Sequence, residues 1–335
     1  MKKVVWGILS TARIGIDHVV PALKASPLVD LRAIASRALP AARDVADRLG
    51  IPQAYGSYAE LLADPEIEAI YNPLPNHLHV PLTLQAAAAG KHVLCEKPIA
   101  ISADEAQQLR EAAGRVHIEE AFMVRHHPQW QWVRELVRGG RIGELRAVQV
   151  FFSYFNNDPA NIRNQVDIGG GALYDIGCYA ILSGRYLFES EPQRVVALVD
   201  RDPVLGTDRT TSAVLDFGGG RQQTFTISTQ SCPYQRVQAV GTRGRLEVMI
   251  PFNAPRGGAM RIAIDDGGAV DGSGVSVETL PAADQYQLEV ESFSRLVRGE
   301  AEHRWGLDDA LGQMRVIDAL WRSERSARWE AVSTP

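Results

Sequence analysis

The sequence predicts a two-domain α/β protein, with a doubly wound parallel sheet in residues 1–122 and an α+β domain in residues 123–335. Three observations support this prediction. Apolar strands and helices alternate with short links from residue 1 to residue 98, which is typical of a doubly wound sheet. After residue 145 several long segments alternate with period two between glycine-rich turns, which indicates an antiparallel sheet. The length of 335 residues favours two domains over one.

The composition excludes several classes of protein. The formal net charge is −5 and no basic stripe is visible, which argues against a nucleic-acid partner. No apolar stretch is long enough to cross a bilayer, and the N-terminus runs directly into a strand rather than a signal peptide. The cysteines are few and far apart, which favours a reducing compartment and gives no support for a structural metal. We therefore expect a cytoplasmic protein. The cysteines are Cys95, Cys178 and Cys232.

A phosphate-binding turn is predicted at the start of the chain. Residues 4–9 form an apolar strand, and residues 16–24 are expected to be helical. A turn of small residues between a strand and a helix attracts a pyrophosphate through backbone N–H groups and the positive helix end. Ser10 and Ala12 stand where the usual fingerprint has glycines, and only Gly15 is in register, so an ordinary βα turn is the alternative. The candidate contacts are Ser10, Thr11, Ala12, Arg13 and Ile14.

The end of the second strand, residues 29–35, predicts the choice of cofactor. Ser36 and Arg37 follow it, where NAD-binding domains normally place a carboxylate for the ribose 2′-hydroxyl. A hydroxyl beside a guanidinium can instead hold a 2′-phosphate. This favours NADP over NAD. Alternatively, Arg37 is a solvated residue opening the helix over residues 38–49.

A third candidate loop follows the buried strand that begins near residue 67, which residues 53–58 and a helix at 59–62 precede. The turn Asn72-Pro73-Leu74-Pro75-Asn76 is expected to line the dinucleotide, with its amides available to the nicotinamide ribose. His77 and His79 have a spacing that could suggest a metal, but no carboxylate or thiol partner is apparent. A packing or helix-start role is favoured, with His79 also a candidate neighbour of the nicotinamide. The candidate cofactor contacts here are Asn72, Pro73, Leu74, Asn76 and His79.

The run Cys95-Glu96-Lys97-Pro98 organises the chain. It follows a helix over residues 81–89 and a short strand over residues 91–95, so Glu96 and Lys97 are expected at the carboxyl edge of the parallel sheet, where ligands bind. Pro98 cannot continue the strand, so the chain must turn there. A lysine on such a turn could clamp a substrate oxygen or transfer a proton. An isolated Lys-Pro pair is usually only a surface turn.

The elements after Pro98 are predicted from capping and periodicity. Ser102 with Glu105 three residues later predicts a helix that ends near residue 113, and a second helix is expected over residues 129–138. Residues 260–277 should form a loop or an edge hairpin. Closing helices are expected over residues 287–298 and 307–323. The predicted strands cover residues 147–155, 194–199, 211–217, 222–228 and 245–250.

A second informative stretch begins with three consecutive glycines at 169–171. Glycines in sequence cost backbone entropy, so their backbone is expected to be crowded by a neighbour. The helix predicted over residues 173–182 carries Asp175 and Tyr179 four residues apart, which places both on one face. A carboxylate and a phenol beside a glycine-lined cleft suit alcohol chemistry. As isolated residues they would more often be a surface aspartate and a packing tyrosine.

These motifs together resemble the Gfo/Idh/MocA family of NAD(P)-dependent oxidoreductases over nearly the whole chain. The closest resemblance is to the branch of NADP-dependent D-xylose 1-dehydrogenases, dimeric dihydrodiol dehydrogenases and glucose-fructose oxidoreductase. The resemblance implies an N-terminal Rossmann domain and a C-terminal domain with a large open, mostly antiparallel sheet that often forms a dimer interface. Many members carry histidine where this chain has Tyr179. The motifs are Glu96-Lys97-Pro98, Asn72 to Asn76, Glu120 to Pro128, Gly169 to Tyr179, Gly241 to Leu246, Pro251 to Asn253 and Asp284 to Tyr286.

The chemistry expected of these residues is hydride transfer to a nicotinamide coupled to loss of a hydroxyl proton. A phenol has a pKa of about 10, and lowering it by two units needs roughly 2.7 kcal/mol. An ammonium about 4 Å away supplies roughly 4 kcal/mol at an effective dielectric constant near 20. Tyr179 could therefore transfer the proton with help from Lys97, or Lys97 could do so directly. Asp175 would orient the substrate or hold Lys97 charged. Candidate pocket residues are Arg125, Phe155 and Asn161.

The predicted function is an NADP-dependent sugar or polyol dehydrogenase of the aldose 1-dehydrogenase type. A trans-dihydrodiol, 1,5-anhydrofructose or a keto-sugar on a nucleotide carrier would fit the same residues. A non-enzymatic NADP sensor is the alternative from a different class, but the presence of Lys97, Asp175 and Tyr179 favours an enzyme. A homodimer or higher oligomer through the C-terminal sheet is expected.

Overall fold

A computed structural model describes residues 2–333, which divide into two compact units. Unit 1 contains the chain up to Met123 together with Gln285–Leu311, and unit 2 contains Val124–Asp284 and the chain from Gly312 onward. The sequence placed a boundary after residue 122. The return of residues 285–311 to unit 1 was not among the predictions.

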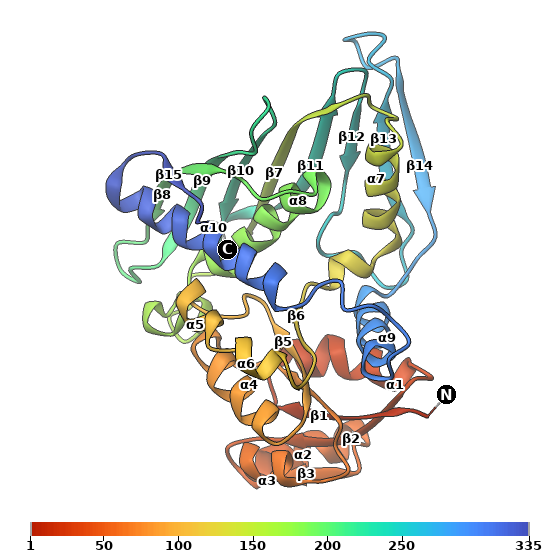
Figure 1. The fold of residues 1–335 in the computed structure, drawn as a ribbon, viewed down its shortest axis with the longest axis vertical. Coiled ribbons are helices and arrows are strands. Elements are labelled where there is room, and N and C mark those ends of the chain that lie inside the picture. The colour runs from red at the N-terminus through yellow and green to blue at the C-terminus, as the bar shows by residue number, and fades with distance from the viewer. Residues whose placement is uncertain (1, 334–335) are drawn as a thin grey trace. The chain divides into compact units, whose positions relative to one another are not determined.

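Unit 1 is built on a six-stranded parallel sheet flanked by helices, drawn in red to yellow in Figure 1. The strands predicted at residues 4–9 and 29–35 are confirmed to the residue. The strand at Ile118–Ala121 was not predicted, because the two glutamates at its centre interrupt the apolar sequence pattern. All four of its residues are nevertheless buried. In sheet order the strands are β3 (Gln53–Tyr55), β2 (Val29–Ala35), β1 (Val4–Leu9), β4 (Ala69–Asn72), β5 (His92–Glu96) and β6 (Ile118–Ala121). The helices are α1 (Val20–Ala25), α2 (Leu39–Leu49), α3 (Tyr58–Ala63), α4 (His79–Ala88), α5 (Ala103–Gln107), α6 (Arg110–Ala113) and α9 (Gln285–Val297).

Helix α9 joins the core of unit 1 although it lies far away in the sequence. Phe293 packs against Trp6 with ring centroids 5.5 Å apart. The indole Nε1 of Trp6 donates to the hydroxyl of Ser294 at 3.2 Å. Both aromatic side chains are fully buried, so each contributes roughly 1.5–3 kcal/mol or more of hydrophobic stabilisation. This packing explains why α9 belongs to unit 1.

Unit 2 is built on a nine-stranded sheet in which β7 and β10 pair in parallel and the other neighbours pair antiparallel. The predicted α/β class with a large, mostly antiparallel second sheet is thereby confirmed. In sheet order the strands are β14 (Val275–Leu280), β13 (Met260–Asp265), β12 (Arg245–Val248), β11 (Gln230–Gly241), β7 (Leu145–Phe155), β10 (Gln222–Ser228), β9 (Asp208–Asp216), β8 (Arg194–Arg201) and β15 (Glu330–Ala331). The main helices are α7 (Pro128–Arg138), α8 (Cys178–Phe188) and α10 (Leu307–Ser326), which starts in unit 1.

Two features of this sheet bear on the predictions. Residues 260–280 form the edge hairpin β13–β14, as expected. Strand β11 was not predicted, because it contains Pro233 and many polar residues and its pairing with β7 is irregular between Gln230 and Tyr234. A proline in a strand is tolerated at such an irregularity.

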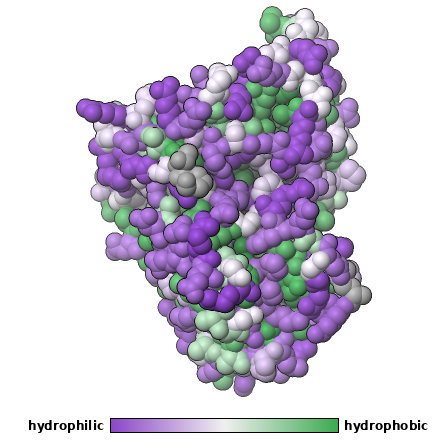
Figure 2. Space-filling model, viewed as in Figure 1, coloured by the Kyte–Doolittle hydropathy of each residue, from purple (hydrophilic) through white to green (hydrophobic). Residues whose placement is uncertain are grey.

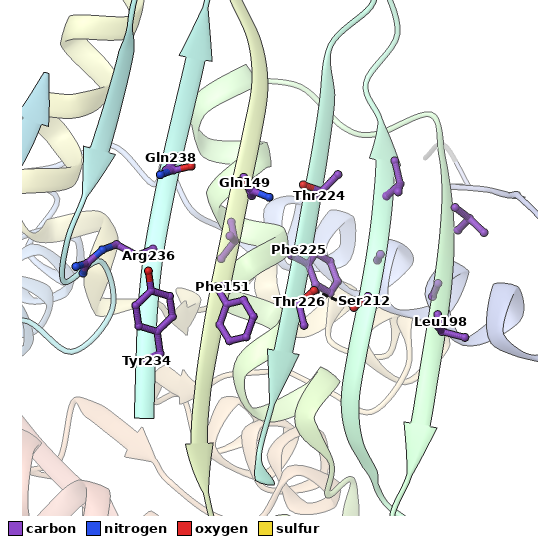
Figure 3. Close-up of a pocket in the computed structure, with 15 residues that line it drawn as sticks. Gln149, Phe151, Leu198, Ser212, Thr224, Phe225, Thr226, Tyr234, Arg236 and Gln238 are labelled. Atoms are coloured by element: carbon purple, nitrogen blue, oxygen red, sulfur yellow. Dashed lines mark hydrogen bonds between the residues drawn. The ribbon is translucent and has the colours of Figure 1, made fainter. Parts of the chain in front are cut away.

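The two faces of the sheet in unit 2 differ in character. Helix α8 packs against β7 and β10 on one face, where Phe152 stacks on Phe252 with ring centroids 4.7 Å apart. The opposite face holds a shallow depression of about 600 Å³ lined by strands β7 to β11. Figure 3 shows the side chains that rise from it, among them Phe151, Tyr234 and Leu198. Leu198 is 76% exposed.

Hydrophilic side chains predominate on the face shown in Figure 2, with apolar ones scattered among them. This is the usual surface of a protein in contact with water. Within residues 2–333, no helix is both long enough and apolar enough to span a bilayer.

Candidate functional site

The turn after β1 adopts a tight conformation although glycines are missing from it. Ser10 has a φ of +84°, a left-handed conformation that normally favours glycine. Its hydroxyl oxygen accepts from the backbone N–H of Ala12 at 3.1 Å, and its own N–H donates to the carbonyl of Ala35 at 2.8 Å. A π-helical segment, Gly15–Val19, then leads into α1. π-Helical segments are rare in proteins, and those that occur often lie at functional sites.

Ser36 and Arg37 lie directly beyond the carboxyl end of β2. The N–H of Ser36 donates to the carbonyl of Tyr55 at 3.1 Å, which fixes the backbone there. Arg37 is exposed and Ser36 is half-buried. Ser36 and Arg37 are adjacent in sequence, and a hydroxyl and a guanidinium are both hydrogen-bond donors that a phosphate can accept from.

The loop after β4 is folded around the side chain of Asn72. Its amide nitrogen lies 3.2 Å from the carbonyl oxygen of His79 and 3.3 Å from the hydroxyl of Thr83, and its oxygen accepts from the N–H of Leu74 at 3.4 Å. Asn72 is fully buried. The sequence predicts that the Asn72 amide is available to a ribose. In the structure this amide already makes hydrogen bonds to neighbouring residues of unit 1. Asn76 is half-buried and begins the short 3₁₀ helix Asn76–Leu78.

His79 lies within the fold of unit 1. It is 1% exposed, and its Nδ1 and Nε2 atoms lie 2.7 Å from the carbonyl oxygens of Pro98 and Leu74, respectively. Burial lowers its pKa to about 4, and the two carbonyls oppose that shift. A packing role, which the sequence favoured, agrees with this placement. Among residues 2–333, no group of three or more His, Cys, Asp or Glu side chains is arranged to hold a metal ion.

Lys97 directly follows β5, at the carboxyl edge of the parallel sheet, as the sequence predicts. The Lys97–Pro98 peptide bond is cis. One oxygen of Glu96 accepts from the hydroxyl of Tyr71 at 2.5 Å and the other from the N–H of Lys97 at 3.3 Å. Burial, with the charge of Glu96, raises the pKa of Tyr71 well above its ordinary value. The phenol is thus a neutral donor that orients Glu96.

In unit 2, Asp175 is held by two side chains that the sequence analysis missed. The hydroxyl of Tyr154 donates to one carboxylate oxygen at 2.5 Å, and Nε of Arg163 donates to the other at 3.0 Å. The side chain of Asp175 is 13% exposed. Burial and the nearby carboxylate raise the pKa of Tyr154 above its ordinary value. The alternation in β7 could have identified Tyr154, but nothing local marks Arg163.

Tyr179 lies one helical turn further on, among aromatic side chains. Its ring centroid is 6.1 Å from that of Phe152 and 5.4 Å from that of Phe252, and the residue is 6% exposed. The helix predicted over residues 173–182 begins as a π-helix, Leu173–Gly177, before α8. The first turn of this helix, which carries Asp175, is therefore π-helical rather than α-helical.

Two of the three glycines, Gly170 and Gly171, lie where the backbone is crowded, and the protein itself crowds them. A Cβ on Gly170 would lie 2.6 Å from the carbonyl oxygen of Gln165, and one on Gly171 would lie 1.8 Å from Oδ1 of Asp208. The other oxygen of Asp208 accepts from the N–H of Leu173 at 2.7 Å. Burial raises the pKa of Asp208 to about 7. Gly171 thus leaves room for Asp208, which caps the helix that carries Asp175.

The three candidate pocket residues have different environments within unit 2. Arg125 is 4% exposed and lies beside Trp130, Leu182 and Tyr186. Phe155, at the end of β7, is 62% exposed. Asn161 accepts from the N–H of Arg163 at 3.0 Å and begins the turn that carries this arginine. Asn161 is therefore linked through Arg163 to Asp175.

Comparisons with known proteins agree with this architecture. Residues 4–124 match the model of an oxidoreductase family with an NAD-binding Rossmann fold, and residues 130–247 match the GFO/IDH/MocA C-terminal domain. An uncharacterized oxidoreductase of Rhizobium meliloti is 46% identical over 99% of this chain and 100% of its own length. A D-xylose 1-dehydrogenase (NADP+) of Haloferax volcanii is 41% identical over 95% of this chain and 96% of its own.

A solved structure is similar over nearly the whole chain. The 3-ketoreductase of Actinomadura kijaniata in complex with NADP and TDP-benzene has a TM-score of 0.90 at 29% identity, over 96% of this chain and 98% of its own. Structures of that enzyme were also solved with a lysine replaced by alanine and with a tyrosine replaced by phenylalanine. The chain described here therefore belongs to the Gfo/Idh/MocA family of oxidoreductases, with an NAD-binding Rossmann domain followed by the family's C-terminal domain.

Proposed function

We propose that this oxidoreductase transfers a hydride between NADP and a carbinol or carbonyl carbon of a sugar or polyol, as an aldose 1-dehydrogenase acting on a substrate such as D-xylose. The observation that carries the proposal is Lys97, half-buried at the carboxyl edge of the parallel sheet with its backbone N–H bonded to Glu96. Ligands of open α/β sheets bind beyond this edge. The similarity to a D-xylose 1-dehydrogenase supports the substrate class.

The residues of unit 1 fit NADP. The left-handed turn at Ser10 and the helical segment from Gly15 would hold the pyrophosphate, together with Thr11, Ala12, Arg13 and Ile14. Ser36 and the exposed Arg37 would hold the 2′-phosphate by charge-assisted hydrogen bonds. The loop from Pro73 to Asn76, with Glu96 and Lys97, would line the nicotinamide end. When bound, the nicotinamide supplies the hydride acceptor or donor.

The proton is assigned to Lys97 and Tyr179. A lysine ammonium favours the ionised form of a nearby phenol, so Tyr179 can exchange the proton while Lys97 stabilises its charge, or Lys97 can exchange it directly. Asp175 would orient the substrate hydroxyl. The hydrogen bonds from Tyr154 and Arg163 support a carboxylate held in a fixed orientation. Arg125, Phe155 and Asn161 remain candidates for the substrate pocket.

A keto-sugar reductase is the second candidate function. The similarity to a 3-ketoreductase solved with NADP and TDP-benzene favours it. The same proton-transfer residues would then donate a proton to a carbonyl oxygen instead of removing one from a hydroxyl.

A substrate panel tests both functions. The purified protein is assayed by absorbance with aldoses, polyols and diols plus NADP+ or NAD+, and with keto-sugars plus NADPH. We expect an aldose such as D-xylose to be oxidised with NADP+ at a higher catalytic efficiency than with NAD+. Turnover of keto-sugars alone would favour the second function, and no turnover of any member would contradict both.

We also propose a homodimer that forms through the open face of the sheet in unit 2, in the cytoplasm. The support is the exposed row of Phe151, Tyr234 and Leu198 among polar side chains (Figure 3). The cysteines are free, and Cys232 is exposed, which favours a reducing compartment. Light scattering should give the mass of two chains for the wild type and of one chain for Phe151→Asp. A monomeric wild type would contradict this assembly.

A further inference from the structure

Two loops of unit 1 are joined by one buried imidazole. The ring of His79 lies between the carbonyl oxygen of Leu74, in the loop after β4, and that of Pro98, in the turn after β5, at 2.7 Å from each. Strands β4 and β5 are parallel neighbours, so both loops leave the same edge of the sheet. The first loop carries candidate nicotinamide contacts, and the second carries Lys97.

Both ring nitrogens of His79 face a carbonyl oxygen. A carbonyl oxygen can only accept, and a neutral imidazole has one N–H donor. In either protonation state the ring therefore donates to at least one of the two carbonyls and fills the space between them. Because His79 is 1% exposed, no water competes for these positions, and removal of the ring would leave at least one of the two carbonyls without its hydrogen-bond donor.

The backbone on both sides of Lys97 is held by buried or half-buried side chains. Before it, Glu96 accepts from the N–H of Lys97 at 3.3 Å. After it, His79 holds the carbonyl of Pro98, and the buried Glu120 accepts from the N–H of Ile99 at 2.8 Å. Among these contacts, only the one from His79 joins this turn to the loop after β4.

We propose that His79 is a positioning residue that sets the placement of Lys97 by holding the Pro98 carbonyl at a fixed distance from the loop after β4. This inference rests on the proposed function, because it assigns to His79 an effect on catalysis that passes through Lys97. It differs from a direct contact with the nicotinamide, since both ring nitrogens are engaged inside unit 1.

The test is a double-mutant cycle in the full chain. His79→Leu, Lys97→Ala and the double variant are assayed with the sugar turned over fastest in the panel above, and NADPH binding is measured by fluorescence. A misplacement of about 1 Å can cost a hundredfold in rate, so His79→Leu should lower kcat by about a hundredfold while the Kd for NADPH stays within about threefold. In the Lys97→Ala background, His79→Leu should cause almost no further loss, because the two effects are coupled.

Two further variants separate positioning from general stability. His79→Gln retains an N–H donor and should recover part of the lost kcat, and it carries the test if His79→Leu does not fold. His92→Leu removes a half-buried histidine at the opposite end of β5, where its Nδ1 accepts from the N–H of His117 at 3.0 Å. This control should leave kcat within about twofold, even if it lowers the melting temperature.

Hydrogen exchange gives a readout that needs no substrate. His79→Leu should speed exchange in the peptide that spans residues 96–101, whereas His92→Leu should do so around residue 117. An inactive Lys97→Ala with a His79→Leu of wild-type kcat would overturn the proposal and leave the proposed function standing. The proposal would also be overturned if His79→Leu lowered kcat by the same factor in Lys97→Ala as in the wild type. A fully active Lys97→Ala would instead contradict the proposed function. Whatever the kinetics show, unchanged hydrogen exchange at residues 96–101 in His79→Leu would contradict the positioning role.

Discussion

The two units place their candidate site residues by different means. In unit 1 these residues follow β1, β2, β4 and β5, and the parallel topology alone brings those strand ends to one edge. In unit 2, Asp175 depends on Tyr154 from β7, on Arg163 from a 3₁₀ turn and on the cap provided by Asp208 from β9. Topology thus places the candidate residues of unit 1, whereas hydrogen bonds from side chains distant in sequence hold the candidate Asp175 of unit 2.

The largest effect is expected from removing the two groups proposed to transfer the proton, one in each unit. Positioned acid–base groups contribute about 10²–10⁴ in rate, so Lys97→Ala and Tyr179→Phe should each lower kcat by roughly a thousandfold with NADPH binding nearly intact. Steady-state kinetics and fluorescence titration measure the two quantities. Lys24→Ala is a matched control, since this exposed lysine donates to the carbonyl of Leu49 at 2.6 Å. Turnover within about twofold of wild type in both variants would refute the assignment.

The cofactor preference tests the strand-end interpretation of unit 1. A carboxylate at position 36 would repel a 2′-phosphate and accept from a ribose hydroxyl. Ser36→Asp should therefore lower the ratio of kcat/KM for NADP+ to that for NAD+ by about a hundredfold, or roughly 2.7 kcal/mol. Asp44→Asn, on α2, provides a charge-changing control away from the strand end. An unchanged ratio would show that Ser36 and Arg37 do not contact the 2′-phosphate.

The side-chain network of unit 2 can be weakened without removing Asp175. Tyr154→Phe deletes one hydrogen bond to the carboxylate, worth about 1.5 kcal/mol or somewhat more because the acceptor is charged. We expect kcat/KM to fall by about tenfold. Tyr234→Phe, on the opposite face of the same sheet (Figure 3), should have no effect. If Tyr154→Phe also had none, the network would not serve Asp175 in catalysis.

The smallest effect is expected in the pH dependence of stability, where Asp208 of unit 2 and two buried or half-buried histidines of unit 1 contribute with opposite signs. The pKa of Asp208 is raised by burial from 3.8 to about 7, so the folded state keeps a proton that the unfolded chain has lost. This contribution is fully present below about pH 4 and is lost as the pH rises through about 7. In unit 1, burial lowers the pKa of His79 and of His92 to about 4, so their contribution is present above about pH 6.5 and is lost as the pH falls toward 4.

Urea unfolding, followed by tryptophan fluorescence, checks this difference. Asp208→Asn should flatten the decline in stability from about pH 5 to about pH 8 while leaving the acid limb unchanged. Asp200→Asn, an exposed carboxylate that pairs with Arg209, should leave both limbs unchanged. An identical slope in Asp208→Asn and wild type would mean that Asp208 does not hold a proton in the folded state near neutral pH.

The difference between strand ends in unit 1 and distant side-chain contacts in unit 2 also explains which residues could be predicted from the sequence. Lys97 and Ser36 were found because a strand followed by a turn is a local pattern, and the location of strand ends in a parallel sheet is a general rule. Tyr154, Arg163 and Asp208 were missed because their partners lie elsewhere in the chain. Strands β6 and β11 were also missed, because two glutamates interrupt the apolar pattern of β6 and Pro233 lies within β11.

The central claim is a direct hydride transfer that requires Lys97. The most direct measurement is the fate of deuterium when D-xylose deuterated at C1 is incubated with NADP+ and the protein, followed by mass spectrometry of the reduced cofactor. We expect the label in NADPH with the wild-type protein and almost none with Lys97→Ala. Unlabelled NADPH from the wild type, or equal labelling with the variant, would contradict the account.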